Sequence, residues 1–308
     1  GWTTLNCFIN GHCSASSILA KHGTPAQKQA YLPRMATGEL RVAIALTEPN
    51  GGSDLQAIRT AAVRDAEGRW RLRGGKTFIT NGERAGAVLV LTRTGEGKGG
   101  ISLFLVDKGT GGFSVGTHAR TMGHRHVDVT ELHFDDVLLG DEHLVGGEPG
   151  HGLTQMLDAL ETGRIAMAAS AVGLARSALK AAVDYAGQRE SFGQPIGNHQ
   201  AIQGLLADMG AKTLAARALV NEAAVIKSRG TRADMVAGMA KLFAGEVCAE
   251  VALNCVRIHG GSGFVSDFPA ERYYREAPYF ILTEGSNEIQ KMVIARRLLR
   301  GDAQAIEL

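Results

Sequence analysis

Glu284 is the acidic residue whose surroundings best suit chemistry. It lies in ILTEGSNEIQ (281–290), ahead of Gly285 and Ser286 and just before a run with helical spacing. The first N–H groups of a helix have no partner within it, and a loop carboxylate beside them can be held facing a cleft. Such a residue could act as a general base. By position alone, however, Glu284 or Ser286 is better explained as a plain helix cap.

Two glycine-rich or aromatic segments could hold a ligand. IALTEPNGGSD (44–54) places a strand before a turn that offers Ser53, Asp54 and free backbone amides, which can cradle a phosphate. In KTFITNG (76–82), Phe78 and Thr80 alternate to one face, so an aromatic wall and a hydroxyl could meet a flat ligand. Taken singly, the two segments are better explained as a strand-ending turn and an amphipathic strand.

Other reactive residue types give weaker patterns. His124 and His126, two apart on an expected strand, would share a face, but no third ligand accompanies them, so no metal site is predicted. Cys248 and Cys255, seven apart on an expected helix, indicate core packing. The basic stretch 295–300 suits the C-terminal end of a helix better than a binding patch.

Composition excludes several classes of protein. The 308 residues are 44% hydrophobic, and 33 basic against 31 acidic residues give a net charge of +2, so no nucleic acid partner is expected. The longest apolar runs considered, 85–91 and 101–106, are far shorter than the roughly 20 residues that span a bilayer, so a soluble protein is expected. Four sparse cysteines favour a reducing compartment, the cytosol.

The elements that must position these residues change in character along the chain. Residues 6–35 suggest short helices, and Thr24-Pro25 predicts a helix start with Thr as N-cap and Pro at N1. From about 41 to 145, short β-leaning runs between Gly, Asp and Asn turns predict an antiparallel sandwich or barrel.

The remainder of the chain has helical periodicity. Ala-, Leu- and Met-rich stretches over 153–190, 200–229 and 232–258 predict a helical bundle. The order α, β, α predicts an α+β protein and disfavours a Rossmann fold. We expect a partial N-terminal helical domain at 1–40, a β domain at 41–150 and a four-helix-bundle domain at 151–308.

Taken together, the motifs resemble the acyl-CoA dehydrogenases, particularly the short-chain and branched-chain members. The resemblance runs nearly end to end in eight ordered motifs: LTEPNGGSD, KTFITNG, MGHR, ETGRIAMAASAVGLARSAL, RESFGQPIGNHQ, HGGSGF, PAERYYREA and EGSNEIQ. The family fold of helices, β-barrel and helices agrees with the order α, β, α predicted from the residue patterns. Relatives carry further helices before GWTTLN, so the chain is expected to lack the start of the N-terminal helical domain.

The resemblance implies an FAD site built from several segments. Thr47, Ser53, Phe78 and Thr80 would contact the flavin ring and pyrophosphate, and Ser286 and Glu288 the nucleotide side. In the family, another group of residues completes the FAD site of a neighbouring subunit: Arg189, Phe192, Gln200, Gly260 and Gly261. A homo-oligomer, a dimer of dimers, is therefore implied. Substrate contacts would come from Glu161, Arg164 and Ser53.

Glu284 matches the catalytic base of the family. The resemblance implies that it takes the α-proton of a short or branched acyl-CoA while flavin N5 accepts the β-hydride, giving the 2-enoyl-CoA. Some relatives carry the base at the position of Gly163, which glycine cannot serve. Electron-transfer flavoprotein would be the acceptor, in fatty acid β-oxidation, in a bacterial cytoplasm or a mitochondrial matrix. An oxidase or flavin monooxygenase on the same scaffold, and a catalytically silent member, are the alternatives.

Four departures from the family pattern concern the active-site pockets. Phe78 stands where Trp is frequent, Thr283 where Tyr often precedes the base, His259 where Leu or Met is frequent, and REA (275–277) replaces Arg-Asp-Ala. None removes a chemical group that the reaction needs. They are expected to alter the shape of the acyl pocket and the cover of the flavin face.

Overall fold

The computed structural model describes residues 3–301, and Gly1, Trp2 and 302–308 lie outside the described residues. Two compact units divide the chain. The sheet unit is Thr4–Leu160, and the helical unit is Thr3 with Glu161–Gly301 among the described residues. The N-terminal helices thus belong to the same compact unit as the sheet.

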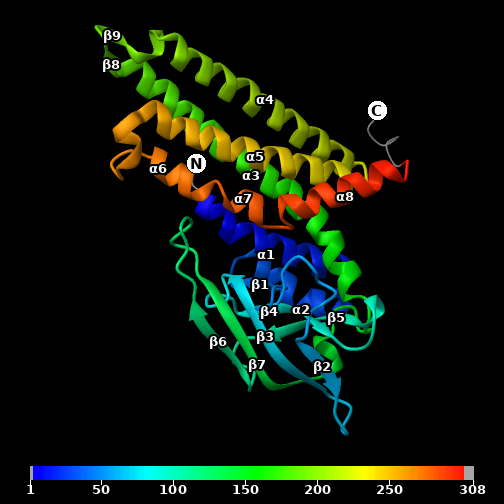
Figure 1. Ribbon diagram of the computed structural model, residues 1–308. Coiled ribbons are helices and arrows are strands. Elements are labelled where there is room, and N and C mark those ends of the chain that lie inside the picture. The colour runs from blue at the N-terminus through cyan, green and yellow to red at the C-terminus, as the bar shows by residue number, and fades with distance from the viewer. Residues whose placement is uncertain (1–2, 302–308) are drawn as a thin grey trace. The chain divides into compact units, whose positions relative to one another are not determined.

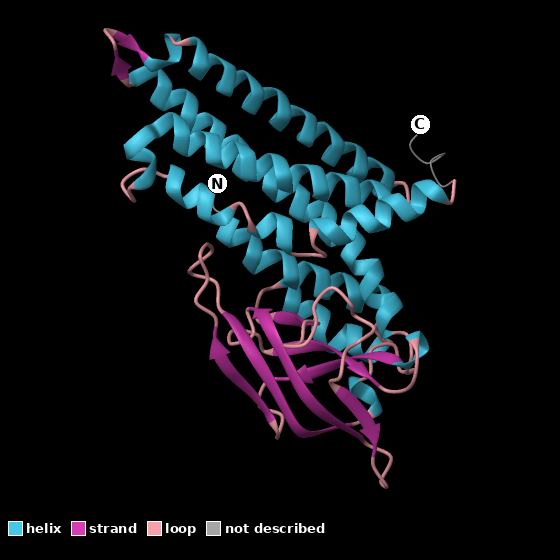
Figure 2. Cartoon of the chain, viewed as in Figure 1, coloured by secondary structure: helices cyan, strands magenta, loops and turns pink. Residues whose placement is uncertain are grey.

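The sheet unit begins with two helices and continues as a seven-stranded sheet (Figures 1 and 2). Its elements are α1 (Thr3–His22), α2 (Pro25–Ala36), β1 (Val42–Ala45), β2 (Ala61–Arg64), β3 (Trp70–Thr80), β4 (Ala87–Arg93), β5 (Ile101–Asp107), β6 (Phe113–His118) and β7 (Val129–Leu139).

The start of α2 confirms the predicted cap. The backbone N–H of Gln27 donates to Thr24 Oγ1 (3.2 Å), and the backbone N–H of Thr24 donates to Gln27 Oε1 (3.0 Å), which is a capping box with Pro25 at the first helical position. The Gln27 amide also donates to the carbonyls of Glu142 and Leu144. The cap therefore ties α2 to the segment after the sheet.

The sheet is largely antiparallel, as expected, but it is mixed. β4 pairs antiparallel with β5 along its whole length, whereas β1 runs parallel to β4, and β2 joins β4 in a parallel pairing at Ala61 and Arg93. Side chains of β4 alternate between two cores: Leu89 and Leu91 pack toward α1 and α2, and Val88 and Val90 pack on the other face. Both faces are buried, so β4 reads as a continuous apolar run.

β3 is one long strand that begins before the KTFITNG segment and ends within it. Its pairing with β7 shifts register between Leu72 and Gly74 and again between Lys76 and Ile79. The second shift places Phe78 in a bulge with φ +56°. The simple alternation expected for Phe78 and Thr80 is therefore interrupted, because a bulge adds a residue to one strand only. β6 was not expected from the sequence.

The helical unit is built on three long helices, which run beside one another in Figure 1. Its elements are α3 (Gly152–Gln188, whose first turns belong to the sheet unit), β8 (Glu190–Ser191), β9 (Gln194–Pro195), α4 (Gln200–Ser228), α5 (Asp234–His259), α6 (Ala270–Glu276), α7 (Tyr279–Leu282) and α8 (Asn287–Leu299). The three predicted long helices are confirmed, and Cys248 and Cys255 are fully buried in the core, as expected.

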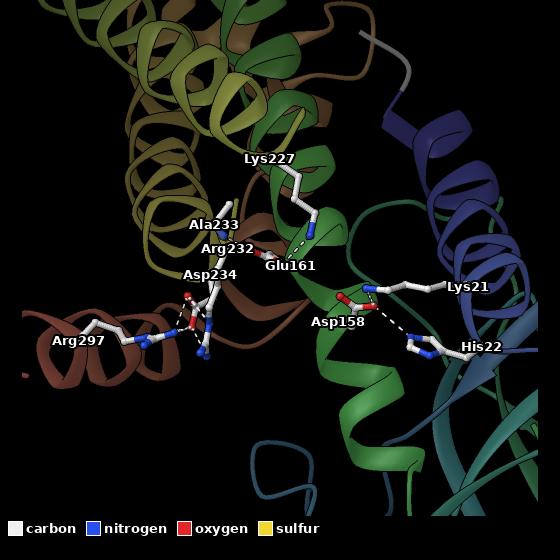
Figure 3. Close-up of polar contacts among 9 residues, drawn as sticks. All are labelled: Lys21, His22, Asp158, Glu161, Lys227, Arg232, Ala233, Asp234 and Arg297. Carbon is white, nitrogen blue, oxygen red and sulfur yellow. Dashed lines mark hydrogen bonds and ion pairs between the residues drawn. The ribbon is translucent and has the colours of Figure 1, made fainter. Parts of the chain in front are cut away.

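Polar ties fix α3 separately within each unit (Figure 3). In the sheet unit, Asp158 pairs with Lys21 (2.5 Å) and His22 (3.0 Å) of α1. Burial raises the pKa of Asp158, but hydrogen bonds from Lys21 and His22 outweigh that and lower it. These contacts anchor the first turns of α3 to the end of α1.

α3 is long and apolar enough by length and composition to cross a bilayer, contrary to the expectation that no segment is. Its most apolar 18-residue window has a mean hydropathy of 1.2. Ala168, Ala171, Leu174, Ala175 and Ala178 of this helix are at most 1% exposed and lie in the core of the helical unit. Core packing accounts for this composition.

Candidate active site

Glu284 lies on the short loop between α7 and α8. Its φ is +56° and that of Gly285 is +83°, so the chain turns sharply before the helix. Ser286 occupies the N-cap position, but its side chain makes no capping hydrogen bond to the backbone. The helix-cap explanation is therefore wrong for Glu284, which precedes the cap position by two residues, and Ser286 does not cap the backbone in the usual way.

The Glu284 carboxylate lies against Gly163 of α3. A Cβ atom added to Gly163 would be 2.9 Å from Oε2 and 3.2 Å from the carboxyl carbon of Glu284. Any side chain at residue 163 would force the carboxylate to move. The structure thus brings together the two positions that the resemblance linked, and only Glu284 carries an acid.

Arg164 and Gln290 hold the main chain of the loop. Arg164 Nε donates to the Glu284 carbonyl (3.3 Å), and Gln290 Nε2 donates to the Gly285 carbonyl (3.0 Å). Both side chains are buried, at 7% and 0% exposure. Burial lowers the pKa of Arg164, and the charges of Glu284, Asp234 and Glu161 partly offset it. Arg164 thus contacts the backbone of Glu284, and its contact with substrate stays a prediction.

Lys241 of α5 also holds this loop, and it was not among the residues predicted for the site. Its Nζ donates to the Ile281 carbonyl and to Asn287 Oδ1, each at 2.9 Å. Asn287 Nδ2 in turn donates to the Leu242 carbonyl (3.2 Å). Burial and the charge of Arg164 lower the pKa of Lys241 to about 8. A single lysine in an Ala-rich helix gives no sequence signal that it is buried.

Glu161 is engaged within the helical unit (Figure 3). Lys227 Nζ donates to Glu161 Oε2 (2.6 Å), and the backbone N–H of Ala233 donates to Oε1. Next along α5, Asp234 pairs with Arg297 (2.8 Å) and Arg232 (3.0 Å). Both carboxylate oxygens of Glu161 therefore tie α3 to the turn between α4 and α5, and its predicted contact with CoA stays a prediction.

In the sheet unit, a buried ion pair holds the loop that carries Thr47 and Ser53. Lys76 Nζ lies 2.8 Å from Glu48 Oε1 and donates to the Leu46 carbonyl (3.0 Å). Glu48 also accepts from the backbone N–H groups of Arg59 (2.7 Å) and Thr60 (2.9 Å). Burial lowers the pKa of Lys76 to about 8 despite the opposing effect of Glu48. For Glu48, burial raises the pKa, but Lys76, the backbone N–H of Arg59 and the side chain of Thr60 outweigh burial and lower the pKa.

The four predicted flavin contacts of the sheet unit have the exposure that a ligand surface needs. Ser53 is exposed, Thr47 and Thr80 are half-buried, and Phe78 is 65% exposed although it is a large apolar ring. The backbone N–H of Thr77 donates to the Thr47 carbonyl (2.9 Å), which joins the loop to β3. Hydroxyls and an aromatic face on rigid backbone suit a flavin and its pyrophosphate.

The contacts predicted to serve a second subunit lie on exposed segments of the helical unit. Arg189 directly precedes the β8–β9 hairpin. Phe192, at the tip of this hairpin, is 95% exposed with φ +52°. Gly260 and Gly261 are exposed, and a Cβ on either would meet nothing within 4 Å. Open backbone, a bare aromatic ring and a guanidinium fit FAD chemistry. Gln200 and Glu288 are exposed, and Ser286 is half-buried.

Backbone strain coincides with the predicted site. Six non-glycine residues in the described part of the chain have positive φ: Phe78, Asn81, His124, Asp136, Phe192 and Glu284. Three of these were predicted as flavin or catalytic residues. Such conformations cost energy and persist where the surrounding structure enforces them.

His124 and His126 do not lie on a strand, contrary to expectation. Both lie in the loop between β6 and β7, and His124 is buried with φ +52°. The shared-face argument for these two residues is therefore wrong, because a turn rather than a pleat orients them.

Family models match the chain in three consecutive segments. The acyl-CoA dehydrogenase N-terminal domain matches residues 1–39, the middle domain 43–137 and the C-terminal domain 150–299. The chain belongs to the acyl-CoA dehydrogenase family. It is an enzyme of that type, with FAD as its cofactor.

Individual relatives and solved structures support the same family assignment. An acyl-CoA dehydrogenase of Bacillus subtilis is 43% identical over 281 residues, covering 91% of this chain and 74% of the relative. The butyryl-CoA dehydrogenase structure from Megasphaera elsdenii is 36% identical, with TM-score 0.94, over 97% of this chain and 78% of that one. A chain solved in work on the electron transferring flavoprotein of Acidaminococcus fermentans is 40% identical, with TM-score 0.92, over 95% and 77%.

Proposed function

We propose that Glu284 is the base that takes the α-proton of a short or branched acyl-CoA, so that the product is the 2-enoyl-CoA. The position of Glu284 carries this proposal. Its carboxylate faces Gly163, and the loop that carries it is held by three buried side chains, Arg164, Lys241 and Gln290.

The α-proton of a thioester is weakly acidic, so its removal needs a positioned base and donors for the developing enolate oxygen. Arg164 and Gln290 hold the carbonyl groups of residues 284 and 285, which fixes the peptide groups that follow Glu284. The family resemblance implies the backbone N–H of Glu284 as one donor to the thioester oxygen. FAD, when bound, supplies the acceptor for the β-hydride.

The short-chain preference rests on similarity to the butyryl-CoA dehydrogenase of Megasphaera elsdenii and on glycine at residue 163. We also propose electron-transfer flavoprotein as acceptor, supported by the relative from the Acidaminococcus study. A homo-oligomer in which the Phe192 hairpin completes a second copy's FAD site is supported by the 95% exposure of that ring. The four free cysteines support a reducing compartment.

The decisive experiment is anaerobic bleaching of enzyme-bound flavin by acyl-CoAs. Glu284→Gln should slow bleaching by roughly 10²- to 10⁴-fold, because the amide cannot accept the proton. Glu250→Gln, which removes an exposed carboxylate of α5, serves as the matched control and should bleach at the wild-type rate. Bleaching of Glu284→Gln at the wild-type rate would remove Glu284 from this role.

The same preparation separates the alternatives. A set of straight and branched short acyl-CoAs, ranked by bleaching rate, defines the acyl chain. Rapid peroxide formation in air would favour an oxidase. A colourless protein that takes up no FAD would favour a catalytically silent member.

A further inference from the structure

Lys241 is the only lysine of the helical unit that the structure buries almost completely, at 1% exposure among the described residues. It lies in the middle of α5, in the sequence AGMAKLFAG, with alanine and glycine around it. Lysine is rarely buried without a specific partner. Its two acceptors, the Ile281 carbonyl and Asn287 Oδ1, are the last turn of α7 and the first residue of α8.

These two bonds bracket the Glu284 loop. Ile281 is three residues before Glu284, and Asn287 is three residues after it. One ammonium group thus fixes both ends of a loop whose middle has positive φ at two consecutive residues. Gly245, one turn further along α5, lets the helix approach closely, since a Cβ there would be 2.8 Å from the Phe280 carbonyl.

The partners of Lys241 in direct contact are uncharged. Its charged surroundings are Arg164 from α3, Glu284 from the loop and Glu288 from α8. Because a carbonyl and an amide oxygen provide only dipoles, the positive charge of Lys241 is not cancelled by contact. Its field acts on the carboxylates of Glu284 and Glu288.

We propose that Lys241 is a positioning residue for the Glu284 base: its ammonium group clamps both ends of the loop and favours the charged carboxylate. The inference rests on the proposed function of Glu284. The clamp needs donor hydrogens directed at both acceptors and, for its field, the positive charge. Loss of the proton from Lys241 therefore removes the field, whereas the two remaining N–H groups can still reach both acceptors.

The first measurement uses the wild-type holoenzyme without any variant. Its rate of flavin bleaching at saturating acyl-CoA should fall as pH rises above about 8, the pKa of Lys241. A bleaching rate that stays constant through this range would overturn the effect of the Lys241 charge on Glu284. Amide hydrogen exchange at 282–286 is measured at neutral pH, as the reference for the variants that test the clamp.

Variants test the residue directly. Lys241→Met should slow bleaching by roughly 10- to 100-fold at neutral pH, since small misplacement of a catalytic group has effects of that size. It should also lose the alkaline decline and expose 282–286 to exchange. Asn287→Asp places a carboxylate beside Lys241, which favours the ammonium and should move the alkaline decline to higher pH.

Lys212→Met is the matched control, because Lys212 also pairs with α5, but at an exposed contact with Glu250. It should leave the bleaching rate and its pH profile unchanged. An FAD-loaded Lys241→Met enzyme with the wild-type rate and pH profile would overturn the inference. If Lys241→Met does not fold, the pH profiles of the wild type and of Asn287→Asp decide. If the wild type is not bleached by any acyl-CoA, the proposed function fails instead, and the exchange of 282–286 in Lys241→Met against the wild type at neutral pH then judges the clamp.

Discussion

Two buried lysines hold the two loops of the predicted site, one in each unit, and their partners differ. Lys76 in the sheet unit and Lys241 in the helical unit are each 1% exposed, and each donates to a main-chain carbonyl ahead of a loop. Burial lowers the pKa of both to about 8. Lys76, however, contacts the carboxylate of Glu48, whereas Lys241 contacts the neutral amide of Asn287.

The difference shows two ways of using one residue type. The Lys76–Glu48 pair closes on itself, since Glu48 also accepts two backbone N–H bonds, so its field outside the pair is small. The Lys241 contact leaves a positive charge near the proposed base. A buried ion pair serves to hold a loop, and a buried lysine with neutral partners can also act on a nearby acid.

The largest expected effect on stability comes from removing Glu48 from its buried ion pair with Lys76. Glu48→Leu leaves the Lys76 ammonium buried without its carboxylate and leaves two backbone N–H groups without their acceptor. We expect the free energy of unfolding of the sheet unit to fall by about 3–5 kcal/mol. Urea unfolding followed by the fluorescence of Trp70, which is 5% exposed in this unit, measures it.

Glu39→Leu makes the same change at an exposed pair of the same unit, since Glu39 is 62% exposed and meets Arg34. It should cost less than 1 kcal/mol or so. Equal losses of the free energy of unfolding in the two variants would mean that the buried Lys76–Glu48 pair contributes no more to stability than an exposed pair.

The next largest expected effect is the change of the free energy of unfolding with pH. Between about pH 8 and the ordinary lysine value of 10.5, the unfolded chain holds protons that the folded chain has released. The free energy of unfolding should therefore rise with pH in this window, by up to about 3 kcal/mol for each buried lysine. Urea unfolding at several pH values across the window tests the sign.

The double variant Glu48→Gln and Lys76→Met assigns the rise to its source. The variant removes both charges of the pair at similar side-chain volume. The part of the rise in the free energy of unfolding that comes from Lys76 should therefore disappear, and the part that comes from Lys241 should remain. A variant whose stability rises as steeply as that of the wild type would show that Lys76 is not titrating in this range.

The smallest effect is expected at an exposed lysine. Lys212→Met removes the pair with Glu250, whose side chains are 42% and 45% exposed. The free energy of unfolding should change by less than about 1 kcal/mol. A larger loss would show that burial is not what distinguishes Lys76 and Lys241.

Local signals in the sequence predicted the elements well where one segment determines its own structure. Thr24 and Pro25 began α2 as expected, and the spacing of apolar residues gave α3, α4 and α5. The bulge at Phe78 and the parallel pairing of β1 with β4 were not predictable, because each depends on which strand lies alongside.

The site was predicted mainly through ordered motifs. Glu284 alone suggested a cap, and only its packing against Gly163 shows where the carboxylate goes. Lys241 and Glu48 were missed as positioning residues. A charged residue in a sequence looks the same whether it is solvated or buried, and only the fold decides which.

The positive φ angles of Phe78, Phe192 and Glu284 have a consequence for protein engineering. Glycine at any of the three would relieve backbone strain, because it adopts this conformation without a side-chain clash. A thermostability screen without selection for flavin content or turnover would therefore reward glycine there. Libraries built on this scaffold should hold these three codons constant, since all three are predicted site residues that a selection for stability alone would replace.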